Sequence, residues 1–115
     1  MKTKPAAIFL VIVLMSNWIP LDAQALESRG NRSCGVWITE GKAGTSARVI
    51  TEAWLVGFLT GLVVATGIDA LRGTDNESLY LWMDNFCQRE PLKSIGDGGT
   101  ELFIKLSEDG KRPVR

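Results

Sequence analysis

The sequence contains no histidine, only two cysteines, and no excess of either charge. Without histidine, general acid–base chemistry would fall to a carboxylate or a lysine, and a metal site would lack a common nitrogen ligand. Thirteen basic residues cancel 13 acidic ones, so net charge gives no reason to expect binding to nucleic acid or to anionic membranes. We therefore expect no metal and no cofactor.

Residues 1–25 have the three parts of a secretory signal peptide. Lys2 and Lys4 form the basic n-region, Ala6–Met15 forms the apolar h-region, and Ala23-Gln24-Ala25 is an A-x-A cleavage site. An uncleaved membrane anchor is the alternative, but an apolar run of 10 residues is too short to span a bilayer. Export with cleavage after Ala25 is the prediction.

The mature chain, Leu26–Arg115, would have 90 residues and a formal charge of −1, which suits one domain with a modest core. Export places Cys34 and Cys87 in an oxidising compartment, where two cysteines normally pair. The single intramolecular pairing available is Cys34–Cys87. A thiol nucleophile or metal ligand is the alternative, but the chain offers neither a histidine nor a third cysteine to assist it.

One long apolar segment, Thr45–Thr66, organises the chain and predicts a helix. Trp54, Phe58, Leu62 and Ala65 follow at spacings of four, four and three, which places them on one helical face. A helix that is apolar on most sides is normally covered by its neighbours, so we expect it at the centre of the domain.

Gly57 and Gly61 form a G-x-x-x-G pattern within this helix. The pattern can signal a membrane dimer, but the apolar run Leu55–Ala65 is shorter than the roughly 20 residues that a bilayer needs. We expect instead that another helix of the same domain crosses closely over the two glycines, and no membrane contact after signal cleavage.

Shorter helical segments flank the central one. Cys34–Glu40 predicts a first helix ending near Gly41, with a short strand as the alternative. Glu77–Arg89 predicts another helix, and Pro91 to about Ser107 a last one with a bend or break at the glycines of 96–99. In the segment Glu77–Arg89 an amphipathic stripe is clear, and its members are Leu79, Trp82, Met83 and Phe86, with Cys87 at the edge.

The segments at either end have weaker signals. Residues 26–33 are expected to be a loosely held start and the last eight residues a tail, so the ordered part is expected to be about 34–107. The pattern as a whole predicts a small all-α bundle of about four helices around the central one, closed by one disulfide.

Several of these residues form a pattern that resembles a known family. Cys34-Gly35-x-Trp37 is followed by the helix with Trp54, Gly57, Phe58 and Gly61, then by Asp69, by LYLWMDNFC at 79–87, and by Pro91-Leu92. This pattern is similar to the Rap/Tai group of small exported immunity proteins, which are found beside type VI secretion effectors in Gram-negative bacteria. The resemblance implies a periplasmic α-helical protein that binds and neutralises a toxic effector. Glycines at 96, 98 and 99 depart from it, because small helix formers such as alanine are expected there.

Three functions remain open at this point. The first is the immunity-type binding module, with Asp69, Asp84 and Asn85 as candidates for contacts with a protein partner. The second is an acid-stress chaperone, which a weaker architectural likeness to HdeA-type proteins suggests. The third is a small structural homodimer that pairs through apolar surface left on the central helix. An enzyme is not expected, because no motif groups Glu52, Asp69 and Asp84.

For each candidate side chain a structural role competes with a functional one. Asp84 lies between two core positions of its helix, so bonding to a neighbouring loop or helix end is the simpler interpretation. Asp69 and Arg72 can pair across one turn at the surface. Trp37, Trp54 and Trp82 are expected to pack in the core rather than to anchor a partner.

Overall fold

The computed structural model describes residues 27–44 and 46–110. The predicted signal peptide, the first residue of the predicted central helix, Thr45, and residues 111–115 of the expected tail lie outside the described residues. Within these described residues, four helices follow one another: α2 (Cys34–Ala43), α3 (Ser46–Thr66), α4 (Asn76–Arg89) and α5 (Ile95–Gly110). The prediction of an all-α domain closed by a Cys34–Cys87 disulfide is confirmed.

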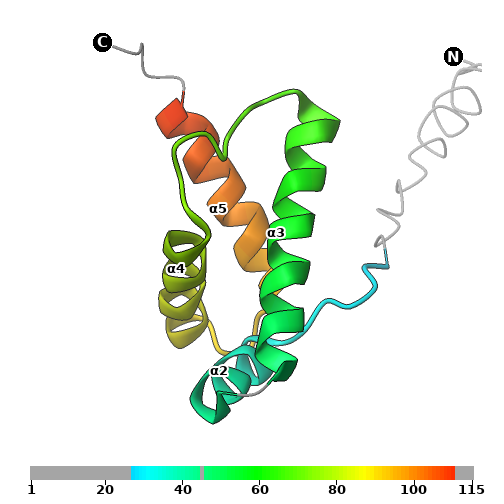
Figure 1. Cartoon of the computed structure of the whole chain (residues 1–115), viewed down its shortest axis with the longest axis vertical. Helices are drawn as coiled ribbons and strands as arrows, with labels where there is room; N and C mark the ends of the chain where they lie inside the picture. Colours follow the sequence, from blue (N-terminus) through cyan, green and yellow to red (C-terminus); the bar gives the residue numbers. More distant parts are fainter. Residues whose placement is uncertain (1–26, 45, 111–115) are drawn as a thin grey trace, which may run out of the picture.

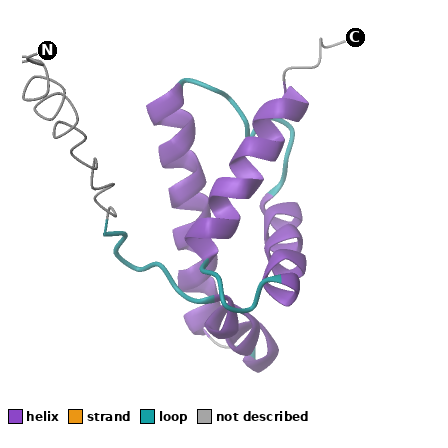
Figure 2. Ribbon diagram, turned by 180° about the vertical axis from the view of Figure 1, so that it is seen from behind, coloured by secondary structure: helices purple, strands orange, loops and turns teal. Residues whose placement is uncertain are grey.

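The helices form one small bundle (Figure 1). The short helix α2 lies at one end, against α3 and α4, and α5 packs against the same two helices further along. Seen from behind, α5 runs between α3 and α4 (Figure 2). The two cysteines join α2 to α4, and both are completely buried.

The segment Cys34–Ala43 forms a helix rather than the alternative strand, and both ends of this helix are capped. The Ser33 hydroxyl accepts a hydrogen bond from the Val36 backbone N–H, and Gly44 ends the helix in a left-handed conformation with φ 60°. The helix therefore continues through Gly41, where we expected it to end. Trp37 lies at its centre and is fully buried, as predicted.

The longest helix, α3, is covered on one side only. Thr51, Leu55 and Leu59 form its buried face, while Ala65, which we grouped with the aromatic residues, is exposed. The expectation that neighbours would cover most of this helix was wrong. A helix that is apolar nearly all round has no polar face from which the sequence could show which side is buried.

The predicted stripe of α4 is confirmed, with Leu79, Met83 and Phe86 buried and Trp82 half-buried against Phe86. Asp75 caps this helix by accepting a hydrogen bond from the Ser78 N–H.

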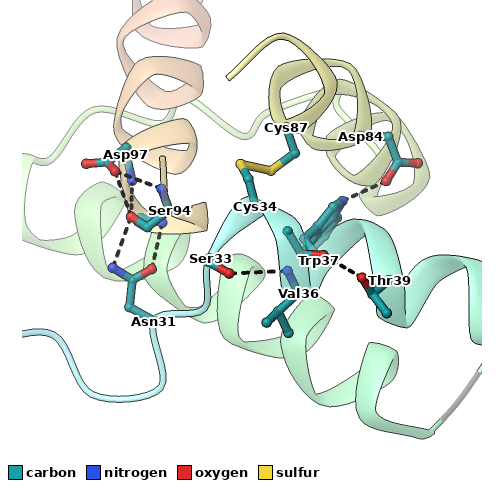
Figure 3. Close-up of a disulfide and its surroundings, with 12 residues drawn as sticks. Asn31, Ser33, Cys34, Val36, Trp37, Thr39, Asp84, Cys87, Ser94 and Asp97 are labelled. Atoms are coloured by element: carbon teal, nitrogen blue, oxygen red, sulfur yellow. Dashed lines mark hydrogen bonds between the residues drawn. A yellow bond between two sulfur atoms is a disulfide. The ribbon is translucent and has the colours of Figure 1, made fainter. Parts of the chain in front are cut away.

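The last helix begins at Ile95 rather than at Pro91, ends at Gly110 rather than near Ser107, and contains no break at the glycines. Its start is set by a capping box. The Asp97 N–H donates to the Ser94 hydroxyl, and the Ser94 N–H donates to the Asp97 carboxylate at 2.9 Å. Figure 3 shows this pair beside Asn31. The break that we expected is absent because the glycines pack tightly against neighbouring helices instead of interrupting this one.

Close helix packing occurs at Gly98 and Gly99. A Cβ atom at Gly98 would lie 2.6 Å from Cδ1 of Phe86 on α4, and one at Gly99 would lie 2.9 Å from Cδ1 of Phe58 on α3. Around Gly57 and Gly61, by contrast, no described atom lies within 4 Å of such a Cβ apart from adjacent residues and the nearby backbone of α3 itself. The close helix contact that we expected at Gly57 and Gly61 is therefore made instead at Gly98 and Gly99 of α5, which lie against Phe86 of α4 and Phe58 of α3.

Residues 29–33 form a strap, and the expectation of a loosely held start was wrong for them. The indole of Trp54 donates to the Arg29 carbonyl at 2.7 Å, and the Gly30 backbone lies under the same ring. The Asn31 amide accepts from the Gly96 N–H, and the Arg32 carbonyl accepts from the Ile95 N–H. The strap thereby satisfies backbone donors at the start of α5, so the ordered domain extends before residue 34.

A matched pair of substitutions tests the packing of the two kinds of glycine. We expect Gly98→Ala to lower the free energy of unfolding by about 1–3 kcal/mol, because buried Phe86 must shift to admit a methyl group. The same change at Gly57 should raise it by up to about 1 kcal/mol, because alanine is the better helix former and has open space there. Urea denaturation followed by circular dichroism measures both. Equal effects at the two positions would contradict this packing.

The capping box makes stability depend on pH. Backbone and hydroxyl hydrogen bonds from Ser94 lower the pKa of Asp97, so the folded state favours its charged form. This contribution is complete above the ordinary aspartate pKa of about 3.9 and is lost as pH falls through the lower, folded-state pKa. We expect Asp97→Asn to be less stable than the wild-type chain at pH 7 and to lose less stability on acidification. Urea midpoints measured between pH 7 and pH 2.5 test this, and parallel curves for the two chains would contradict it.

Candidate functional site: a cleft between α2, α3 and α4

A polar cleft of about 320 Å³ opens where α2, α3 and α4 meet. Side chains of all three helices form its walls, and these residues are Ile38, Gly41, Lys42, Arg48, Glu52, Asp84 and Gln88. Of the residues that the sequence suggested for partner contacts, Asp84 lies in it. The cleft thus places one predicted contact residue, Asp84, at a concave surface.

Arg48 of α3 forms the floor of the cleft and ties the three helices together. Its guanidinium donates to Glu52 at 2.7 Å, to the Trp37 carbonyl at 2.7 Å and to Asp84 at 2.9 Å. It also lies 3.7 Å from the centre of the Trp37 ring, a cation–π distance. The side chain is only 12% exposed, so a positive charge is held almost inside the protein.

The backbone of α2 leaves room for this charge. A Cβ atom at Gly41 would lie 2.7 Å from Nη1 of Arg48, so only glycine lets the guanidinium pack this closely against α2. Burial opposes the charge of Arg48, but the hydrogen bonds that it donates to Asp84 and Glu52, together with the negative charges of both, outweigh burial, and the pKa of Arg48 is raised. The cation is therefore permanent and its two carboxylate partners are fixed in place.

Asp84 is held from two sides. Its Oδ1 accepts from the Trp37 indole N–H at 2.7 Å and from Arg48. Figure 3 shows the first of these bonds close to the disulfide. The two helices that carry Trp37 and Asp84, α2 and α4, are therefore also joined covalently beside the cleft. The interpretation that Asp84 bonds a neighbouring segment agrees with this geometry, although its partners are the helices α2 and α3 themselves.

The carboxylates of Asp84 and Glu52 each have one oxygen that accepts no hydrogen bond from the described residues. Within residues 27–44 and 46–110, no hydrogen bond is made to Oδ2 of Asp84 or to Oε2 of Glu52. The two side chains are 40% and 23% exposed, so both can be reached from outside. Two accessible acceptors on a rigid frame can bind an ammonium or a guanidinium group.

The other predicted contact residues lie elsewhere. Asp69 is exposed in the loop after α3, at the end of that helix remote from α2 (Figure 1), where it pairs with Arg72 at 2.8 Å as predicted. Asn85 is exposed on α4 and does not line the cleft. The structure therefore does not bring Asp69, Asp84 and Asn85 together into one site.

The aromatic residues of the predicted core divide into two groups. Trp37 and Phe86 are buried. Trp54, Phe58 and Trp82 are half-buried, and Trp54 stacks on Phe58 at 5.2 Å between ring centres.

The outer face of α3 is a second exposed feature. It consists of the residues on the side opposite Leu55, namely Val49, Ile50, Ala53, Gly57, Thr60, Gly61 and Val64, and all seven are exposed. By length and composition α3 is apolar enough to cross a membrane, with a mean hydropathy of 1.8 and 17% of its most apolar stretch buried. Our argument from the shorter run Leu55–Ala65 underestimated this helix. The absence of membrane contact stays a prediction.

Sequence reasoning missed Arg48 and Gln88 as members of the site. An Arg–Glu pair four residues apart was a readable signal for Arg48 and Glu52. The third partner was not readable, because Asp84 lies 36 positions further along the chain. Nothing in the sequence distinguishes Gln88 from any other exposed helix residue.

Comparisons with protein-family models, with curated proteins and with solved structures find no match for this chain.

Proposed function

We propose that this chain is an exported protein-binding module that neutralises a secreted effector in the periplasm, and that it contacts its partner through the cleft at Asp84. The resemblance described above supplies the kind of partner. The observation that carries the proposal is the cleft itself, a rigid concave surface with two accessible carboxylate oxygens.

The charges of the cleft indicate what the partner presents. Three N–H groups of Arg48 already donate hydrogen bonds to Glu52, Trp37 and Asp84. The groups that remain for a partner are chiefly acceptors, the second carboxylate oxygens of Glu52 and Asp84. A lysine or arginine side chain of the partner can enter the cleft and bond to both carboxylates. Lys42 lines the same cleft and disfavours a partner with a second cation nearby.

The test uses the oxidised chain Leu26–Arg115 at pH 7 as bait, with lysate of the source bacterium. The tag belongs at the C-terminus, because the strap at 29–33 packs against Trp54. The proposal expects one stoichiometric partner, which mass spectrometry identifies and which is then purified for calorimetry.

Adding a charge of either sign at position 88 tests whether that partner binds at the cleft. We expect Gln88→Lys to weaken binding about 10-fold or more and Gln88→Glu to tighten it, because the charge of position 88 faces the incoming cation. Asn85→Lys and Asn85→Glu are the matched controls, since Asn85 is an exposed amide on the same helix outside the cleft. Equal effects at positions 85 and 88 would refute the cleft as the contact surface.

A further inference from the structure

The strap at residues 29–33 is attached to the domain by hydrogen bonds and buries little of itself. All of its residues are exposed. In three of its attachments, strap oxygens accept from donors of α3 and α5: the Arg29 carbonyl from the Trp54 indole at 2.7 Å, the Asn31 side chain from the Gly96 N–H at 2.9 Å, and the Arg32 carbonyl from the Ile95 N–H at 2.9 Å. A segment that depends on exposed hydrogen bonds and few apolar contacts is among the first parts of a fold to open.

The Ser94 hydroxyl joins the strap to the capping box of α5 (Figure 3). It donates to Oδ2 of Asp97 at 2.8 Å, and it accepts from the Asn31 side-chain N–H at 3.1 Å and from the Asp97 backbone N–H at 3.2 Å. A hydroxyl has one proton and two lone pairs, so donation to Asp97 leaves both lone pairs for these two donors. The Asn31 amide is thereby oriented, with its nitrogen toward Ser94 and its oxygen toward the Gly96 N–H. One carboxylate thus fixes the central residue of the strap.

The row Asn31–Ser94–Asp97 couples attachment of the strap to the charge of Asp97. Hydrogen bonds from the Ser94 backbone and hydroxyl lower the pKa of this carboxyl. A hydroxyl that accepts a hydrogen bond becomes a stronger donor, so the bond from Asn31 strengthens the one from Ser94 and lowers the pKa of Asp97 further when the strap is attached. By linkage, attachment is strongest above the ordinary aspartate pKa of about 3.9 and weakens as pH falls through the pKa of the attached state.

The charged groups around the start of α5 favour the same response. The turn before α5 contributes Lys93, whose positive charge lowers the pKa of Asp97, and the strap contributes Arg29 and Arg32. The side chains of α3 and α4 that meet this end of α5 are uncharged. Acid also removes the negative charge of the carboxylates on these and adjoining segments, which are Glu27, Glu90 and Glu101. The three cations then lack counter-charges, and their repulsion opposes attachment.

We propose that the strap is an acid-sensitive device that opens before the domain unfolds: protonation of Asp97 releases residues 29–33 from α3 and α5, while the four helices stay packed. Release uncovers the Trp54 ring, under which Gly30 lies, and frees the N–H groups at the start of α5. The helices stay packed because the disulfide and the buried core contain no titratable group. The proposal is independent of the proposed function, since neither the strap nor its bonding partners line the cleft.

The test is proton exchange at two indole N–H groups, followed by NMR of the oxidised chain Leu26–Arg115 between pH 5 and pH 2.5. The Trp54 N–H reports the strap, and the Trp37 N–H, which is bonded to Asp84 from a fully buried side chain, reports the helices. We expect the protection of Trp54, divided by that of Trp37, to fall about 5-fold, on the scale of one hydrogen bond. The division removes the pH dependence of the intrinsic exchange rate, which the two groups share. A constant ratio would overturn the proposal, because the strap and the helices would then open together or not at all.

Two substitutions show whether Asp97 is the group that titrates. Asp75 is the matched control, because it caps α4 by the same kind of bond, from the Ser78 N–H, and also has a lowered pKa, but makes no such bond to the strap. Asp75→Asn should keep the wild-type fall. Asp97→Asn should show the low ratio already at pH 5, where circular dichroism checks its folding, and should change little on acidification. An undiminished fall in Asp97→Asn would overturn the role of Asp97, and the wild-type ratio alone decides whether the strap opens if this variant does not fold.

Discussion

Replacing Arg48 by methionine is expected to lower the free energy of unfolding by about 3 kcal/mol. The substitution removes three hydrogen bonds and the contact with the Trp37 ring, and it leaves Glu52 and Asp84 without their cation. Removing one partner of a buried ion pair is costly because the charge that remains is poorly solvated. The partial exposure of Asp84 places the loss at the lower end of the range for fully buried pairs.

Two further variants separate charge from packing. Arg48→Met combined with Asp84→Asn should recover part of the lost stability, because an asparagine oxygen can still accept from the Trp37 indole without an unpaired charge. Arg72→Met is the matched control: its pair with Asp69 is 81% exposed on the arginine side and should contribute less than about 1 kcal/mol. Guanidinium denaturation measures all three, and similar losses at positions 48 and 72 would contradict the role given to Arg48.

Removing the disulfide is expected to have the largest effect of all. The bond joins residues 53 positions apart, and closing a loop of that length stabilises by about 4 kcal/mol on the chain-entropy model. Domains of this size have a total stability of only about 5–10 kcal/mol. Both sulfurs are buried between α2 and α4 beside Trp37 and Phe86, so the cleft should lose its shape when the bond is absent.

The measurement is thermal unfolding of the oxidised chain with and without a reducing agent, together with Cys34→Ala/Cys87→Ala. We expect reduction and the double substitution to lower the midpoint by about 15 °C or more, on the scale of 4–8 °C per kcal/mol for small domains. The reducing agent should not affect the double variant. A shift of less than about 5 °C would mean that α2 is held by its other contacts alone.

The parts of the fold that could be predicted were those with a local signal. The stripe Leu79–Phe86 has one polar side, so its period fixed both the helix and its buried face. The disulfide followed from having two cysteines in a chain predicted to be exported. Ser94 and Asp97 also carried a readable capping signal, and using it would have placed the start of α5 at Ile95 instead of Pro91.

The predictions that were wrong concern features that depend on contacts between distant segments. Helix α3 is apolar nearly all round, and its orientation is set in part by Thr51, a polar residue whose hydroxyl donates to Glu40 of α2. A glycine in a helix can mark a break, a close contact or an exposed face, and the sequence does not say which. Gly98 makes the close contact that we expected at Gly57, and Gly57 lies on an exposed face, because α5 packs against α3 and α4 through its own glycines.

The most direct test of the proposed function is growth of cells that export the partner captured by the bait to the periplasm, with and without this chain. The account predicts that the partner alone stops growth and that the wild-type chain and Asn85→Lys restore it, while Gln88→Lys fails to do so. A partner that is harmless in the periplasm, or whose toxicity the wild-type chain does not relieve, would contradict the account.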